Sequence, residues 1–157
     1  MSIHFLNPTQ FKGWVEGLIE SQTIVAPQTQ GDRFAFAPLR KADDLRLDYD
    51  VTLLPPKKYF QPPVESLLSF KGPDCTSHLA EHEPFVLFGV HPYDLVAILQ
   101  MDTIFSSGEY DAHYMARRER ATIVAVDVQN ASPHVFAGCM GTAVVTEGFD
   151  VLLTRLD

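Results

Sequence analysis

Cysteine is scarce in this chain, whose 157 residues include only Cys75 and Cys139. Two thiols allow at most one internal disulfide, and neither has a second cysteine at the short spacing of metal-binding motifs. A four-cysteine zinc site and a cysteine-bound iron–sulfur cluster each need more thiolates than these. The composition excludes both kinds of centre for this chain alone, and we expect no metal and no cofactor in it.

Basic residues are also few, with 12 lysines and arginines against 20 aspartates and glutamates and a formal net charge of −8. Nucleic acids and anionic membranes favour a basic face, so we expect no nucleic-acid partner. No apolar stretch reaches the roughly 18 residues of a membrane span, and the opening MSIHFLNPTQFKGW lacks the cationic start and apolar core of a signal peptide. We therefore expect no membrane insertion and a cytoplasmic location.

The strongest enzyme signatures are absent too. No GxGxxG, GxxxxGKS, GxxxxGKT, GxSxG or HExxH pattern occurs in the sequence. We therefore assign no catalytic residue. Whether the protein is an enzyme stays open, with no activity expected from the chain alone.

Apolar residues make up 46% of the chain, enough for one core, so we expect a single domain over residues 1–157. Asn7 can cap a helix and Pro8 suits its first position, and the apolar residues that follow recur at helical spacing. This pattern predicts a helix from about Pro8 to Glu20. Two β-prone runs around Gln30-Gly31-Asp32 predict a hairpin.

Proline dominates the next segment, with four prolines in the nine residues from Pro55 to Pro63. Proline restricts its own backbone and that of the preceding residue, so residues 53–63 are expected to form a structured, extended connector within the domain. Pro63 then predicts the start of a short helix through Leu67 and Leu68. The following GPDCTSHLAEHE is polar turn material with a mild preference for strand or coil.

The second half carries the clearest fold signal. Two short all-apolar runs, Phe85 to Val90 and Thr122 to Val128, predict strands covered on both faces, with a helical pattern from Pro92 to Phe105 between them. Such an arrangement is typical of a parallel βαβ unit. GEYDAHYMARRER predicts a second, exposed helix, and Asp150 to Leu156 a last strand. We predict an α/β fold with a mixed sheet and a parallel βαβ unit in the second half; an α+β sandwich is the alternative.

The stretch VLFGVHPYDLVAI places His91, Tyr93 and Asp94 where a parallel strand meets a helix N-terminus. Crevices at this position are frequent ligand sites in α/β folds. Each residue also has a structural interpretation: Asp94 as a helix cap, His91 as a surface or turn residue satisfied by the backbone, and Tyr93 as a packing residue. We keep His91 and Asp94 as candidate ligand or docking residues.

The exposed helix adds four further candidate ligand or docking residues: Asp111, Tyr114, Arg117 and Arg118. Two arginines can clamp a carboxylate or a phosphate. Alternatively, they complement the helix dipole and pair with Asp111 or Glu119. An acid–base pair of Asp111 with His113 is a further option, but their helical spacing favours a solvated face.

Several blocks of this sequence resemble one family. The turn GVHPYDLVAI is followed by Asp102, Phe105 and the four candidates of the exposed helix, and then by FAGCMG and GFDVLLT. With the upstream LLPPKKYFQPPVESL, these blocks resemble the N-terminal domain of iron–sulfur electron-transfer subunits related to the sulfhydrogenase β subunit and the A subunit of anaerobic sulfite reductase. The resemblance runs from about residue 51 to the end. It implies an oxidoreductase complex, a protein partner and 4Fe-4S clusters.

The same resemblance implies cluster ligands that this sequence lacks. In the family the turn reads Gly-Val-x-Pro-Cys-Asp, and an ungapped reading of this and the later cysteine positions finds four non-ligands: Tyr93, Val128, Val135 and Ala137. Valine and alanine have no donor atom, so family-type ligands cannot hold a cluster here. The family's C-terminal ferredoxin-like region, with its CxxCxxCxxxC runs, is also absent from these residues. We interpret the turn as a former ligand position and expect Tyr93 to be buried against Phe136, Ala137 and Met140.

Two functions follow as hypotheses. In the first, the chain is a non-catalytic domain or subunit of a hydrogenase-like or sulfite-reductase-like electron-transfer assembly, and it docks a cluster-bearing partner or forms a homo-oligomer. Candidate docking surfaces are the region of Tyr110 and Tyr114 and the connector with Tyr59 and Phe60. In the second, it is a small-ligand or metal-binding protein, or an enzyme, that uses the strand–helix crevice at His91 and Asp94.

Overall fold

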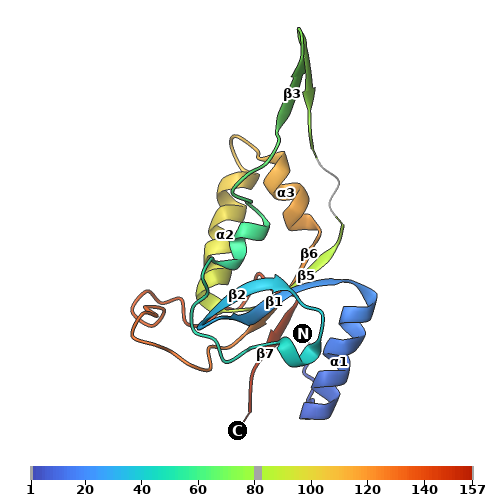
Figure 1. The fold of residues 1–157 in the computed structure, drawn as a ribbon. Coiled ribbons are helices and arrows are strands. Elements are labelled where there is room, and N and C mark those ends of the chain that lie inside the picture. Colours follow the sequence, from blue (N-terminus) through green and yellow to red (C-terminus); the bar gives the residue numbers. More distant parts are fainter. Residues whose placement is uncertain (1, 80–82, 157) are drawn as a thin grey trace.

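A five-stranded mixed sheet forms the centre of the molecule (Figure 1). The computed structural model describes residues 2–79 and 83–156. The strands lie in the order β2-β1-β5-β6-β7; β1, β5, β6 and β7 are parallel, and β2 is antiparallel to β1. Their bounds are β1 Thr23–Gln30, β2 Arg33–Pro38, β5 Phe85–Val90, β6 Ala121–Val126 and β7 Val151–Leu153. The predicted α/β fold with a mixed sheet is confirmed.

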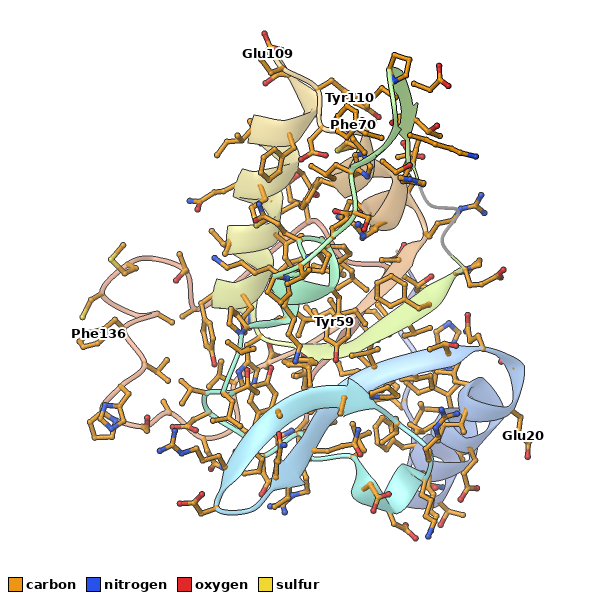
Figure 2. All side chains as sticks on the ribbon, turned by 45° about the horizontal axis from the view of Figure 1, so that its top comes forward. Glu20, Tyr59, Phe70, Glu109, Tyr110 and Phe136 are labelled. Atoms are coloured by element: carbon orange, nitrogen blue, oxygen red, sulfur yellow. The ribbon has the colours of Figure 1, made fainter. Side chains whose placement is uncertain are left out.

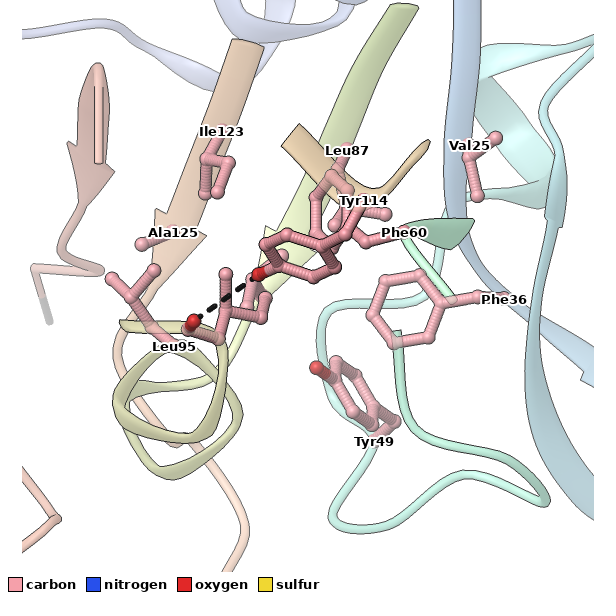
Figure 3. Close-up of a cluster of buried hydrophobic side chains, with 11 residues drawn as sticks. Val25, Phe36, Tyr49, Phe60, Leu87, Leu95, Tyr114, Ile123 and Ala125 are labelled. Atoms are coloured by element: carbon pink, nitrogen blue, oxygen red, sulfur yellow. Dashed lines mark hydrogen bonds between the residues drawn. The ribbon is translucent and has the colours of Figure 1, made fainter. Parts of the chain in front are cut away.

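Helices cover both faces of this sheet, which explains the uniformly apolar strands. Helix α1 (Pro8–Ser21) packs on one face through Val15, against a cluster that includes Val86 and Phe88. Helices α2 (Pro92–Ser106) and α3 (Ala112–Glu119) and the short 3-10 helix η2 (Pro56–Tyr59) cover the other (Figure 3). A second 3-10 helix, η1 (Ala42–Asp44), lies beside α1. A second cluster lies on the face covered by α2, α3 and η2. Because alternate strand residues point to opposite faces, Leu87 belongs to this second cluster.

The predicted βαβ unit is present as β5, α2 and β6, with α3 inserted before β6. Its register pairs Phe85 with Ala121 and shifts between Phe88 and Val90. Gly89 occupies that irregularity with φ +80°, and a Cβ there would lie 3.0 Å from the side chain of Leu47. Glycine is favoured here because the backbone angle strains other residues and a Cβ would crowd the Leu47 side chain.

The segment after the connector differs from the prediction. The expected short helix from Pro63 through Leu68 is wrong: Leu68–Lys71 forms strand β3, which pairs antiparallel with β4, Asp74–Ser77. Gly72 has φ +64° in the turn between them, which suits a tight hairpin. These ten residues, 68–77, form a separate sheet that projects from the body, and we call them the hairpin arm (Figure 1). Residues 80–82 of the predicted turn material lie outside the described residues.

The last strand is shorter than predicted, since β7 spans Val151–Leu153 instead of 150–156. Its entry is held by Asp150, whose carboxylate accepts a hydrogen bond from the Ile123 amide at 2.8 Å. Between β6 and β7, residues 127–150 contain no regular helix or strand. We call this segment the long loop, and it ends close to α2, where a Cβ on Gly148 would lie 2.7 Å from the Leu99 side chain.

Candidate functional site

His91 follows the bulged strand β5 at the turn into α2 and is completely buried, so its interpretation as a surface residue is wrong. Its ring stacks on the ring of Tyr49, with centroids 3.9 Å apart and planes 7° from parallel. The Tyr49 hydroxyl in turn donates a 2.7 Å hydrogen bond to the Gly89 carbonyl. The strand–helix turn is thus packed from one side by a residue that is distant in sequence.

Tyr93 closes the turn from the other side. Its hydroxyl donates to the carbonyl of Asp50 and lies 2.5 Å from Nδ1 of His91. Because the hydroxyl proton is used on Asp50, the geometry requires His91 to donate from Nδ1. Nε2 of His91 is then a buried acceptor, and it has no partner among residues 2–79 and 83–156. Burial lowers the pKa of His91 to about 4, so the ring is neutral at pH 7.

Asp94 does not cap helix α2, contrary to its structural interpretation. The N-cap residue is His91, without a side-chain cap bond, and Asp94 lies in the first helical turn. Its carboxyl is half-buried, and burial raises its pKa to about 6, although the positive charge of Lys57 acts in the opposite direction. A carboxylic acid with this pKa can exchange a proton near neutral pH.

The candidates of α3 are used inside the fold. Asp111 caps the helix, accepting hydrogen bonds from the amides of His113 at 3.0 Å and Tyr114 at 2.9 Å. Tyr114 is buried in the second cluster, where its hydroxyl bonds to the Ile98 carbonyl (Figure 3) and to Asp102 at 2.5 Å. Asp111 is therefore neither part of an acid–base pair nor a free surface carboxylate.

The two arginines have other partners than predicted. Arg117 is 7% exposed; it donates to the Phe60 carbonyl at 3.0 Å and forms an ion pair with Glu65. Arg118 pairs with Asp102, with Nε 2.9 Å from the carboxylate. The predicted pairing with Asp111 or Glu119 is wrong, because the connector folds back onto α3 and brings Glu65 to the guanidinium. Both arginines tie elements together, and Arg117 also lines a cavity beside the connector.

The proposed former ligand positions do not offer a donor set for an iron–sulfur cluster. Val128 and Val135 are half-buried, Ala137 is buried, and the Tyr93 phenol is occupied by Asp50 and His91. Such clusters are held by thiolates, so these residues do not fit the group that the resemblance implies. Within the part of the chain that the structure describes, no group of three or more His, Cys, Asp and Glu side chains is placed to hold a metal ion.

The expected burial of Tyr93 against the long loop is wrong. Tyr93 is half-buried, and Phe136 and Met140 are 67% and 72% exposed. Figure 2 shows Phe136 projecting from the long loop, away from the body. The two proposed docking surfaces also change, because Tyr114 and Phe60 are buried whereas Tyr110 stays exposed.

Sequence reasoning missed two cavities. The first, about 360 Å³, lies between the connector and β5 and is lined by Lys58, Tyr59, Pro62, Pro63, Glu83, Phe85 and Arg117. The second, about 390 Å³, lies at the end of α1, between residues 19–24 and 38–40. The prolines and aromatic residues of the connector, several of which line the first cavity, were the available signal for it. Neither cavity is lined by His91 or Asp94.

Fold and site together define a mixed α/β domain whose strand–helix turn is closed by its own side chains. The chain is 30% identical to the Sulfhydrogenase 2 subunit beta of Pyrococcus furiosus over 151 residues, which are 96% of this chain and 45% of that protein. It thus spans less than half the length of that relative. The relatedness predicted from GVHPYDLVAI and the later blocks is supported by this similarity.

Two other comparisons found no match. No protein-family model matches the chain. No solved structure matches it. Among the helices that the structure describes, none combines the length and the apolar character needed to cross a membrane.

Proposed function

We propose that the chain is a non-catalytic domain or subunit of a redox electron-transfer assembly, and that it docks a protein that carries the clusters. The observation that carries this proposal is the similarity to a sulfhydrogenase β subunit along 96% of the chain. A sulfhydrogenase is by name a redox enzyme built from subunits. Relatedness of this extent favours a role in a similar assembly. Because this chain has too few cysteines to hold a cluster, we place the clusters in the partner protein.

The closed turn supports a non-catalytic role. His91 and Tyr93 engage Tyr49 and the Asp50 carbonyl, so their polar atoms hold the loop around residues 49–50 against the helix. A hydroxyl and a ring nitrogen that are consumed by internal hydrogen bonds are not available to a substrate. The turn therefore works as a joint of the fold.

The long loop provides a docking surface. Its apolar side chains Phe136, Met140 and Val144 are 67%, 72% and 75% exposed. The loop is held in shape by backbone hydrogen bonds from Met140 to Phe136 at 3.0 Å and from Thr142 to Ala137 at 2.9 Å. Exposed phenylalanine and methionine on a preorganised loop are typical of protein interfaces.

The alternative is a small ligand at the strand–helix crevice. It is favoured by one observation, the buried Nε2 of His91, which has no partner in the described residues. The raised pKa of Asp94 adds a proton-exchanging group nearby in the sequence. The two cavities lie elsewhere, however, which makes this the second candidate.

Anaerobic purification of the affinity-tagged chain from its source cells tests the proposal. We expect the wild-type chain to elute with iron, a cluster absorption band and viologen-linked electron-transfer activity, and the double variant Phe136→Ser and Met140→Ser to lose all three. Ile3→Ser is the matched control, because Ile3 is similarly exposed on the N-terminal segment. Iron-free eluates of the wild type, or equal eluates of wild type and double variant, would contradict the docking role of the long loop.

A further inference from the structure

The hairpin arm lacks what an isolated β-structure needs for stability. It has only two strands, all eight strand residues are exposed, and it forms no ladder with the main sheet. A two-stranded hairpin alone is at most marginally stable in water, whereas three or more strands with an apolar face are stable. The arm therefore needs additional strands or a surface to pack on.

The arm has one apolar and one polar face. The register pairs Leu68 with Ser77 and Phe70 with Cys75, so these four side chains share a face. Leu68 is 52% exposed and Phe70 is 71% exposed, and Figure 2 places Phe70 at the projecting end of the molecule. The opposite face is polar and is formed by Ser69, Lys71, Asp74 and Thr76.

The outer edge of β4 is open to a further strand. The His78 amide donates to the Leu67 carbonyl at 2.9 Å, so the pairs 69–76 and 71–74 are the hydrogen-bonded ones. The amides and carbonyls of Cys75 and Ser77 consequently point away from β3. Proteins usually guard such edges with lysine, proline or charged side chains, and β3 carries Lys71. β4 carries Asp74 at its turn end, but its residues 75–77 are small and uncharged, so this part of the edge is unguarded.

We propose that β4 pairs antiparallel with β4 of a second copy of this chain, which creates a four-stranded sheet. A two-fold axis at Thr76 places Cys75 opposite Ser77 of the second copy, so that every outward amide and carbonyl of both residues is paired. The same register sets Asp74 against His78 of the second copy, an acidic group against a basic one. The second copy thus supplies the strands and the hydrogen bonds that one arm lacks.

The joined sheet carries Leu68 and Phe70 of both copies on one face. The apolar area gathered there is a few hundred Å², a size typical of interaction sites. Pairing of two such short edges leaves this face exposed and buries less than the roughly 800 Å² per partner of a standard interface, so we expect a dimer that dissociates in the micromolar range. This inference goes beyond the proposed function and does not depend on it, because the arm and the long loop are separate segments.

A cysteine cross-link tests the register. In a background with Cys75→Ser and Cys139→Ser, Thr76→Cys places two thiols directly opposite each other at a non-hydrogen-bonded pair, where the Cα atoms lie about 4.5 Å apart. We expect most of the chain to become a covalent dimer under mild oxidation. Ser69→Cys is the matched control: it faces the same side of the arm one strand further from the axis, and we expect at least tenfold less cross-linking.

Analytical ultracentrifugation of the protein without engineered cysteines provides the second measurement. Cys75→Pro removes an outward amide and spares the ladder with β3, and we expect at least a tenfold weaker dimer than for Cys75→Ser. A micromolar dimer should be largely formed at a protein concentration of about 100 µM. The proposal is overturned if the wild type is still monomeric at that concentration, or if cross-linking is equal at positions 69 and 76. Capture of a different protein by the arm of a monomeric chain overturns it too. Should Cys75→Pro fail to fold, the cross-linking comparison alone decides.

Discussion

Replacement of Arg117 by methionine is the most direct test of how this fold is held together. The guanidinium joins three elements: it is in α3, it donates to the Phe60 carbonyl after η2, and it pairs with Glu65 of the segment leading to the arm. Methionine keeps most of the apolar stem and removes every donor. The variant therefore leaves the Phe60 carbonyl without its donor and the Glu65 carboxylate with only the His113 ring, whose Nδ1 lies 3.3 Å away.

The expected loss is about 2–4 kcal/mol of unfolding free energy. Removing one member of a fully buried ion pair costs about 3–5 kcal/mol, and a hydrogen bond from a charged donor contributes about 1.5–3 kcal/mol. The Glu65 side chain keeps 21% of its exposure, so water relieves part of its lost pairing and lowers the total. For a chain of this size the loss corresponds to a melting temperature lower by roughly 5–12 °C.

Urea unfolding followed by circular dichroism measures this change. Arg118→Met is the matched control: Asp102 keeps the hydrogen bond from Tyr114, and we expect a loss of about 1 kcal/mol. The double variant Glu65→Gln and Arg117→Met should lose less than the sum of the single variants, because the carboxylate that lost its guanidinium partner is also removed. A loss below about 0.5 kcal/mol for Arg117→Met, or full additivity, would refute this account of the joint.

Three further predictions concern the strand–helix turn. Gly89→Ala should destabilise the protein by about 2–4 kcal/mol in urea unfolding, because alanine meets Leu47 at 3.0 Å and a φ of +80°; an unchanged midpoint would contradict the bulge geometry. The wild type should lose about 3 kcal/mol of stability as the pH rises from about 4 to above 6, and Asp94→Asn should abolish this loss. The folded pKa of Asp94 is raised to about 6, so the folded state holds the extra proton in that window; parallel pH profiles of both proteins would exclude this. Anaerobic reconstitution with iron and sulfide should yield no stoichiometric cluster, since Tyr93 stands at the proposed ligand position, and a cluster band in the visible spectrum would sink the former-ligand hypothesis.

Much of the fold could be predicted from local patterns. The strand Phe85–Val90 and the start of the helix at Pro92 were found at their observed bounds, because an all-apolar run and a proline at the first helical position are strong local signals. The hairpin arm was missed because a strong local signal, the proline at position 63, pointed to a helix. Its strands are four residues each, too short for alternation to outweigh the helix-start signal of Pro63.

The location of the candidate site was predicted, but the burial and the partners of its side chains were not. His91 was expected near the surface, yet it is buried because Tyr49 stacks on it from a segment 42 positions earlier. Arg117 was paired with neighbours on its helix, and its carbonyl partner Phe60 is 57 residues away. Side-chain partners at such separations depend on how the connector crosses the sheet, which no local pattern encodes.

The amino-acid sequence by itself determined the chemistry that this chain can supply and the periodicity of its elements. With two cysteines it has too few thiolates for a cluster, and its apolar strands require cover on both faces. Tertiary structure alone decided which polar groups are consumed and which remain free. It closed the turn with Tyr93 and the Asp50 carbonyl and left the arm and the long loop exposed, because burial and hydrogen bonding depend on contacts between segments that are distant in the chain.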